Sequence, residues 1–129
     1  MKRKVLVVVC GVLAVVLGVL VGGSMWAYSK GYYHAYRGGI AQGNKNLDSA
    51  ISFFTTAYAK NPEAFMVAHD IACCYALKGD NESCFRWLRL ALKSGYADFA
   101  KKYAKTEPDF ASVRQTPEFQ SLVYDSSNK

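Results

Sequence analysis

The residues best suited to chemistry lie within one short stretch of the chain. His69 and Cys73 are four positions apart, so they share one face of a helix, and Cys84 follows on the expected next helix. Imidazole and thiolate groups are common zinc ligands, but four clean ligands are lacking here. We therefore expect no metal and no cofactor. Cys84 is interpreted as the small residue that a close helix crossing requires, and Cys74 as a packing residue.

The cysteines also allow a redox interpretation. A disulfide from Cys84 to Cys73 or Cys74 is the alternative if the chain lies in an oxidising compartment. Cys10 lies within an apolar run and is interpreted as a lipid-facing or helix-packing thiol. Four Cys among 129 residues are too few for a small protein held together by disulfides.

No other pattern indicates catalysis. The sequence contains no Gly-rich phosphate loop, no His-Glu-x-x-His and no Cys-x-x-Cys-His. Carboxylates such as Asp48, Asp80 and Asp109 fall mostly at expected helix ends, where capping and the helix dipole account for them. We therefore expect a protein that is not an enzyme.

The charge of the chain argues against a nucleic-acid partner. The sequence has 16 Lys plus Arg against 10 Asp plus Glu, but Lys2, Arg3 and Lys4 account for three of the 16. The rest of the chain is only +3, which is a weaker basic character than phosphate binding usually requires. The basic residues from Arg86 to Lys105 are interpreted as a solvated surface, and the alternative is contact with anionic headgroups or an acidic partner.

The N-terminus predicts a membrane anchor. Val5–Val21 carries no charge, and the apolar run extended to Tyr28 has 24 residues. At 1.5 Å per residue it reaches roughly 36 Å, enough to cross the hydrocarbon core. Trp26 and Tyr28 stand where an aromatic belt is expected. We predict a basic tag at 1–4 and a transmembrane signal anchor at 5–28, with the lipid bilayer as a partner through Val5–Tyr28.

The basic tag sets the predicted orientation. Lys2, Arg3 and Lys4 place the N-terminus in the cytoplasm and the remaining chain outside it. The expected localisation is a bacterial inner membrane, crossed once, with an extracytoplasmic C-terminal domain. The alternative is a signal peptide cleaved near Gly22-Gly23-Ser24, which would release a secreted soluble protein.

Residues 29–129 read as helices throughout. Apolar residues recur at three- and four-residue intervals over Leu47–Tyr58, Val67–Tyr75 and Phe85–Leu92. Asn46 can cap one helix, and Gly79 can end another. We therefore predict an all-α fold.

A 34-residue register relates two parts of this helical region. Small residues align with small ones and large apolar residues with large ones: Gly38 with Ala72, Ala50 with Cys84, Phe54 with Leu88, and Ala57 with Ala91. The period and the pattern resemble the tetratricopeptide repeat (TPR) family. The resemblance is carried by Leu47-Asp48-x-Ala50-Ile51-x-x-Phe54-x-x-Ala57 with Pro62, and by Tyr75, Gly79-Asp80 and Ala91-Leu92. It implies one repeat at 31–62 and a second at 65–96.

The C-terminal part resembles the end-of-group segment that closes many bacterial arrays of this repeat. Pro108 and Pro117 each suit a first helical position, and Thr116 suits a cap. We expect capping helices at 97–123 and a disordered tail at 124–129. The predicted fold is therefore a single N-terminal transmembrane helix followed by a short TPR-like right-handed stack, with two helix pairs plus C-terminal capping helices.

The resemblance implies a protein-binding groove on the first helix of each repeat. Its expected residues are Tyr32, Ala35, Gln42, Met66, His69, Cys73 and Leu77. The expected function is a membrane-anchored, non-catalytic scaffold or adaptor that binds another protein or peptide in the cell envelope. The alternative is a small single-pass subunit of a membrane complex whose main contact is the transmembrane helix, through Gly18-x-x-x-Gly22.

Overall fold

The computed structural model describes residues 15–26 and 30–125, and every element of secondary structure in these ranges is helical. This confirms the predicted all-α class. After the helical stretch 15–26, the elements are α2 (Tyr32–Gly43), α3 (Leu47–Lys60), α4 (Phe65–Lys78), α5 (Asn81–Lys93), α6 (Ala97–Thr106), the short 3-10 helix η1 (Pro108–Phe110) and α7 (Pro117–Tyr124).

Side-chain caps and a left-handed glycine set the helix boundaries. The amide of Ser49 donates to Asn46 Oδ1 at 3.2 Å, and the amide of Ser83 donates to Asp80 Oδ1 at 3.0 Å. These bonds satisfy N–H groups that the first turn of a helix leaves unpaired. Gly79 ends α4 with a φ of 78°, a conformation that glycine adopts without the steric penalty of a Cβ atom.

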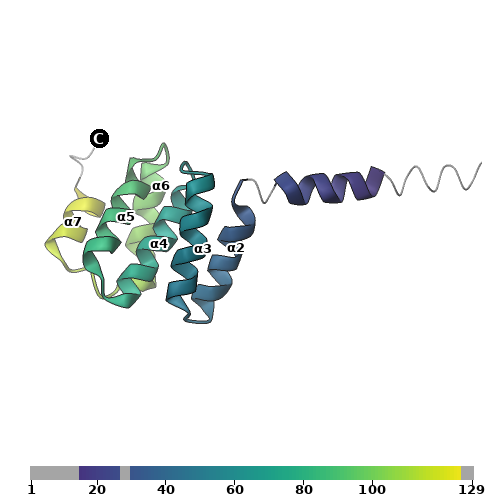
Figure 1. The fold of residues 1–129 in the computed structure, drawn as a ribbon. Coiled ribbons are helices and arrows are strands. Elements are labelled where there is room, and N and C mark those ends of the chain that lie inside the picture. Colours follow the sequence, from purple (N-terminus) through teal and green to yellow (C-terminus); the bar gives the residue numbers. More distant parts are fainter. Residues whose placement is uncertain (1–14, 27–29, 126–129) are drawn as a thin grey trace, which may run out of the picture.

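The helices form antiparallel neighbours, with α2 against α3 and α4 against α5 (Figure 1). Helix α4 also contacts α3, α6 and η1, while α7 packs on α5 and α6. Helix α4 is therefore enclosed on most sides. Its buried residues are Val67, Ala68, His69, Ile71, Ala72, Cys73, Cys74 and Ala76.

Small residues allow the first helix pair to pack closely. Gly38 is buried in α2, and a Cβ atom at this position would lie 2.6 Å from Cδ1 of Phe54 in α3. Gly31 precedes α2 with a φ of 83°, and a Cβ atom there would lie 2.7 Å from the carbonyl oxygen of Ala57. Both glycines therefore fix how near α2 approaches α3.

The predicted membrane-spanning helix is corrected by the structure. Among the residues that the structure describes, no helix is both long and apolar enough to cross a membrane. The rest of the predicted anchor, at 5–14 and 27–28, lies outside the described residues. The alternative function as a single-pass subunit requires this helix.

Parts of both chain ends also lie outside the residues that the structure describes. Residues 1–4, predicted as a basic tag, and residues 126–129 of the predicted tail are not among the described residues. Of that tail, Tyr124 is the last residue of α7 and Asp125 follows it. Tyr124 is therefore helical, and not disordered as predicted.

Two adjacent glycines should respond to alanine in opposite directions. Gly38→Ala should destabilise the fold by about 1–3 kcal/mol, because the buried Phe54 ring must move to admit the new methyl group. Gly39→Ala should stabilise it by up to about 1 kcal/mol, because a Cβ atom there meets nothing within 4 Å and alanine is the better helix former. Urea unfolding followed by far-UV circular dichroism measures both. Shifts in the same direction would contradict the close packing of α2 on α3.

The crossing of α4 and α5 makes a second prediction. Cys84 in α5 is completely buried in the core that α4 and α5 share. Cys84→Ala should have little effect, whereas Cys84→Leu should destabilise the fold by about 1–3 kcal/mol through overpacking. Thermal unfolding of both variants gives the comparison, and equal tolerance of leucine and alanine would show that the helices do not pack closely at this position.

Candidate functional site

The structure divides the seven predicted groove residues into three sets. Three are exposed, with relative accessible surfaces of 52% for Tyr32, 37% for Met66 and 48% for Leu77. Ala35 and Gln42 are partly buried. His69 and Cys73 are each only 1% exposed, so they cannot meet a partner at the surface.

The C-terminal segment covers His69 and Cys73. The Phe110 ring of η1 packs edge-on against the His69 imidazole, with ring centroids 5.3 Å apart. Tyr103 of α6 makes a similar contact at 6.4 Å. The inner side of α4 at these two residues is therefore covered by α6 and η1 and is not open to a partner. No local signal in the sequence indicates that η1 folds back onto α4.

An open hollow remains where α2, α4 and η1 meet. It has a volume of about 690 Å³ and is lined by residues from all three elements, the α2–α3 turn and the start of α3: Gly39, Gln42, Gly43, Lys45, Leu47, Leu77 and Asp109. We refer to it as the inner hollow. Gln42 Nε2 donates a hydrogen bond of 2.9 Å to Asp109 Oδ2, and this contact joins α2 to η1. Of the predicted groove residues, the hollow brings together Gln42 and Leu77, while Asp109 was not predicted for the groove.

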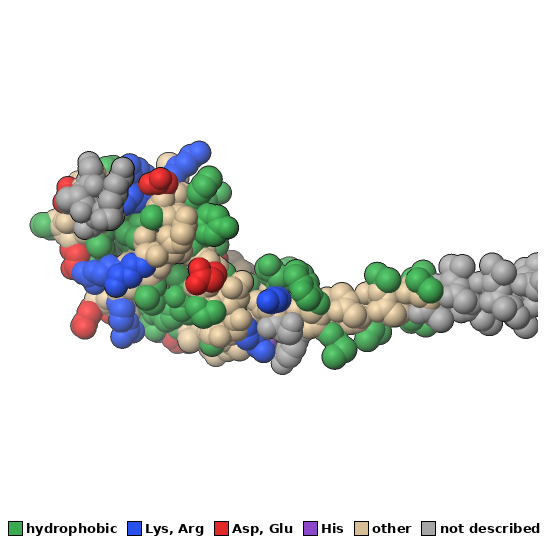
Figure 2. All heavy atoms as spheres, turned by 90° about the horizontal axis from the view of Figure 1, so that it is seen from above, with side chains coloured by type: hydrophobic (Ala, Val, Ile, Leu, Met, Phe, Trp, Pro, Cys, Tyr) green, Lys and Arg blue, Asp and Glu red, His purple; other side chains and the backbone are tan. Residues whose placement is uncertain are grey.

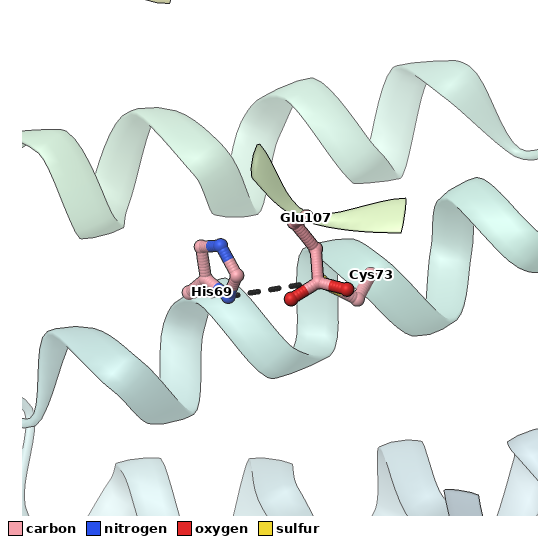
Figure 3. A group of neighbouring side chains, drawn as sticks. All are labelled: His69, Cys73 and Glu107. Atoms are coloured by element: carbon pink, nitrogen blue, oxygen red, sulfur yellow. Dashed lines mark hydrogen bonds between the residues drawn. The ribbon is translucent and has the colours of Figure 1, made fainter. Parts of the chain in front are cut away.

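A second group of functional side chains lies beneath the surface. His69 and Cys73 project from one side of α4, and Glu107 reaches over them from the segment that follows α6 (Figure 3). Cys73 Sγ is 3.7 Å from His69 Nδ1, and one ligand atom from each of the three residues lies within 4.8 Å of the other two. We refer to this group as the His–Cys–Glu cluster. His69 and Cys73 share one face of α4, as their spacing predicts, whereas Glu107 was not predicted and Cys84 is not part of the cluster.

The cluster is acidic and largely closed to water. Burial, followed by the nearby charges of Glu107, Asp70 and Asp109, raises the pKa of the Cys73 thiol far above its usual value. The Cys73 side chain is therefore a neutral thiol at physiological pH, and it is not a nucleophile by itself. Asp70 Oδ1 is 3.8 Å from His69 Nδ1, beyond hydrogen-bonding distance.

The other two described cysteines have a packing role. Cys74 and Cys84 are completely buried, and Cys73, Cys74 and Cys84 are all free thiols. Desolvation raises the pKa of Cys74 to about 12 and that of Cys84 to about 12. The disulfide alternative is therefore not what the structure shows, and the small buried thiols fit their interpretation as packing residues.

The basic residues of α5 do not form a uniformly positive surface. Arg89 forms an ion pair with Glu118 of α7, so part of this charge is neutralised within the chain. Figure 2 shows basic and acidic side chains interspersed with hydrophobic ones on the face in view. The basic residues between Arg86 and Lys105 therefore fit the interpretation as a solvated surface.

Comparisons with known proteins give a partial match. No protein-family model matches the chain, and no solved structure matches it. Among curated proteins, it is similar to a protein of Arabidopsis thaliana that is named as chloroplastic, with 30% identity over 83 residues. The match covers 62% of this chain and 24% of the relative, so the chain spans about a quarter of the length of the protein that it resembles.

The predicted localisation is corrected on two findings. The described residues contain no helix able to cross a membrane, and the similar plant protein carries a chloroplast designation in its name. The prediction of a bacterial inner-membrane protein is therefore wrong. It had depended on the composition of the apolar N-terminal run and on a resemblance to bacterial repeat arrays.

The burial of the thiols predicts their reactivity. In a Cys10→Ser background, a disulfide reagent such as DTNB at pH 8 should not label the native chain, because Cys73, Cys74 and Cys84 are buried and remain protonated. In urea all three should react at the rate of a free thiol. Rapid labelling of even one thiol in the native chain would contradict the coverage of α4 by its neighbours.

Proposed function

We propose that this chain is a TPR-like helical module that binds a segment of another protein in the inner hollow, without catalysis. The observation that carries the proposal is the inner hollow itself. Exposed apolar surface on Leu77 faces a space bordered by α2 and by η1, and the Gln42–Asp109 hydrogen bond joins those two borders.

The burial pattern supports the repeat interpretation. Residues related by the 34-residue register are buried alike in the two helix pairs. Three of the four pairs are at most 2% exposed: Ala50 and Cys84, Phe54 and Leu88, and Ala57 and Ala91. A repeated helix pair that stacks in this way leaves a surface along its first helices, which is where the inner hollow lies.

The lining of the hollow indicates the kind of segment that fits. Leu47 and Leu77 provide apolar walls, and the carboxylate of Asp109 is already bound by Gln42. Lys45 is the cation among the lining residues. An extended peptide that inserts one apolar side chain between the two leucines matches this surface better than a strongly charged ligand does.

The described residues also support a role without chemistry. The Cys73 thiol and the His69 imidazole are neighbours. Both are buried beneath η1, and neither lines the inner hollow. A catalytic nucleophile and its base must reach the substrate, and neither group does so here. Recognition by shape and apolar contact is therefore the function that we favour.

The proposal is tested at the hollow and at a matched control surface. A photo-crosslinking residue at position 77 should capture a partner in cells, and the same residue at position 86 should not. With the captured protein purified, Leu77→Glu should weaken binding by about 10- to 100-fold, the value of one buried apolar side chain. Circular dichroism should show unchanged helicity, because the Leu77 side chain is exposed.

The control reverses charge away from the hollow. Arg86→Glu with Lys93→Glu alters two exposed residues of α5 and leaves the Arg89–Glu118 ion pair intact. This variant should bind as the native chain does, and affinity should change little between about 0.05 and 0.5 M NaCl. If the charge reversal removes binding and the hollow variant does not, the basic surface of α5 is the binding site and the proposal is wrong.

A further inference from the structure

The His–Cys–Glu cluster contains a buried histidine whose polar atoms are poorly satisfied. The His69 side chain is 2% exposed, and its Nε2 has no hydrogen-bond partner among the described residues. Its Nδ1 lies 3.7 Å from the Cys73 sulfur, a weak partner, and 3.8 Å from Asp70 Oδ1, which is beyond hydrogen-bonding distance. Because buried polar groups are nearly always paired, the weakly bonded Nδ1 is the atom at which a stronger partner is expected, whereas an ion bound there would leave Nε2 as it is.

We propose that Nδ1 of His69, Sγ of Cys73 and a carboxylate oxygen of Glu107 together bind one zinc-class divalent ion, with water in a fourth position. The three side chains converge from α4 and from the segment after α6 (Figure 3). This inference does not depend on the proposed protein-binding function.

The distances suit a tetrahedral ion. With bonds of about 2.0 Å to nitrogen and about 2.3 Å to sulfur, two ligand atoms of one zinc lie about 3.5 Å apart. The Sγ–Nδ1 distance is 3.7 Å, and all three ligand atoms lie within 4.8 Å of one another. Two of the bonds therefore form almost without movement, and a small rotation of the flexible Glu107 side chain completes the set.

The charges also fit a divalent cation. The thiolate of Cys73 and the carboxylate of Glu107 together neutralise a charge of +2, so the loaded cluster would be neutral, with the thiol proton released to solvent. Burial of a neutral group avoids the penalty that an unpaired ion would incur. The carboxylates of Asp70 and Asp109 add negative potential nearby, as their effect on Cys73 shows.

The ligand types select the metal. Sulfur and imidazole nitrogen are zinc ligands, and three protein ligands with one open position form a common zinc arrangement. Calcium and magnesium prefer oxygen ligands alone. The backbone of Glu107 is held by Arg114, which donates a hydrogen bond to the Glu107 carbonyl oxygen, and the Asp109 amide donates to Glu107 Oε1 at 3.3 Å.

The test uses cobalt as a spectroscopic probe and zinc as the ligand. The full-length chain carrying Cys10→Ser, stripped with chelator, should bind one Co²⁺ per chain and show a thiolate-to-cobalt charge-transfer band. Zinc should displace the cobalt and raise the melting temperature, because the ion joins α4 to the turn at Glu107. Glu107→Gln and Cys73→Ala should each lower the zinc affinity at least about 10-fold, the loss that follows even when a residue supporting a ligand is removed.

A neighbouring thiol provides the matched control. Cys74 is equally buried but lies outside the cluster, so Cys74→Ala should keep the charge-transfer band and the affinity of the native chain. Circular dichroism of the metal-free variants shows whether each one folds, and Glu107→Gln keeps an oxygen for the Asp109 amide. No charge-transfer band in the native chain, or a band that survives Cys73→Ala, would overturn the proposal.

Discussion

The enclosure of helix α4 is the constraint on which the rest of the structure depends. Helices α3 and α5 flank it, and α6 and η1 cover its inner side. Close helix packing of this kind admits only small or apolar side chains at the contacts. Ala68, Ala72 and Ala76 meet this requirement, and so do the buried thiols. His69 is the exception, because it is a polar residue held at the centre of the contact with α6 and η1.

Much of the fold could be predicted from the sequence because its determinants are local. The caps at Asn46 and Asp80 and the left-handed glycine at Gly79 act within one helical turn. The burial of Phe54 and Leu88 follows from apolar periodicity and from the 34-residue spacing. Such signals define where helices begin and end and which side they bury. They do not determine what the buried side packs against.

The errors came from contacts that no local signal encodes. The repeat pattern predicts an open groove at His69 and Cys73 on the inner side of α4, but the C-terminal segment covers both residues. Glu107 joins them only because the chain reverses after α6 and η1 returns to α4. The membrane prediction is contradicted on a separate finding. It requires a long apolar helix, and among the described residues no helix is both long and apolar enough to cross a membrane.

The turn after α6 links the two proposed sites physically. The Asp109 side chain holds Gln42 at the border of the inner hollow, and the Glu107 side chain, two residues earlier, faces His69 and Cys73. An ion bound at the cluster would restrain this turn and with it the Asp109 border of the hollow. A peptide that binds the hollow in this arrangement would in turn favour the position of Glu107 that binds the ion. Because coupling between two sites is reciprocal, ion and peptide would each increase the affinity of the chain for the other.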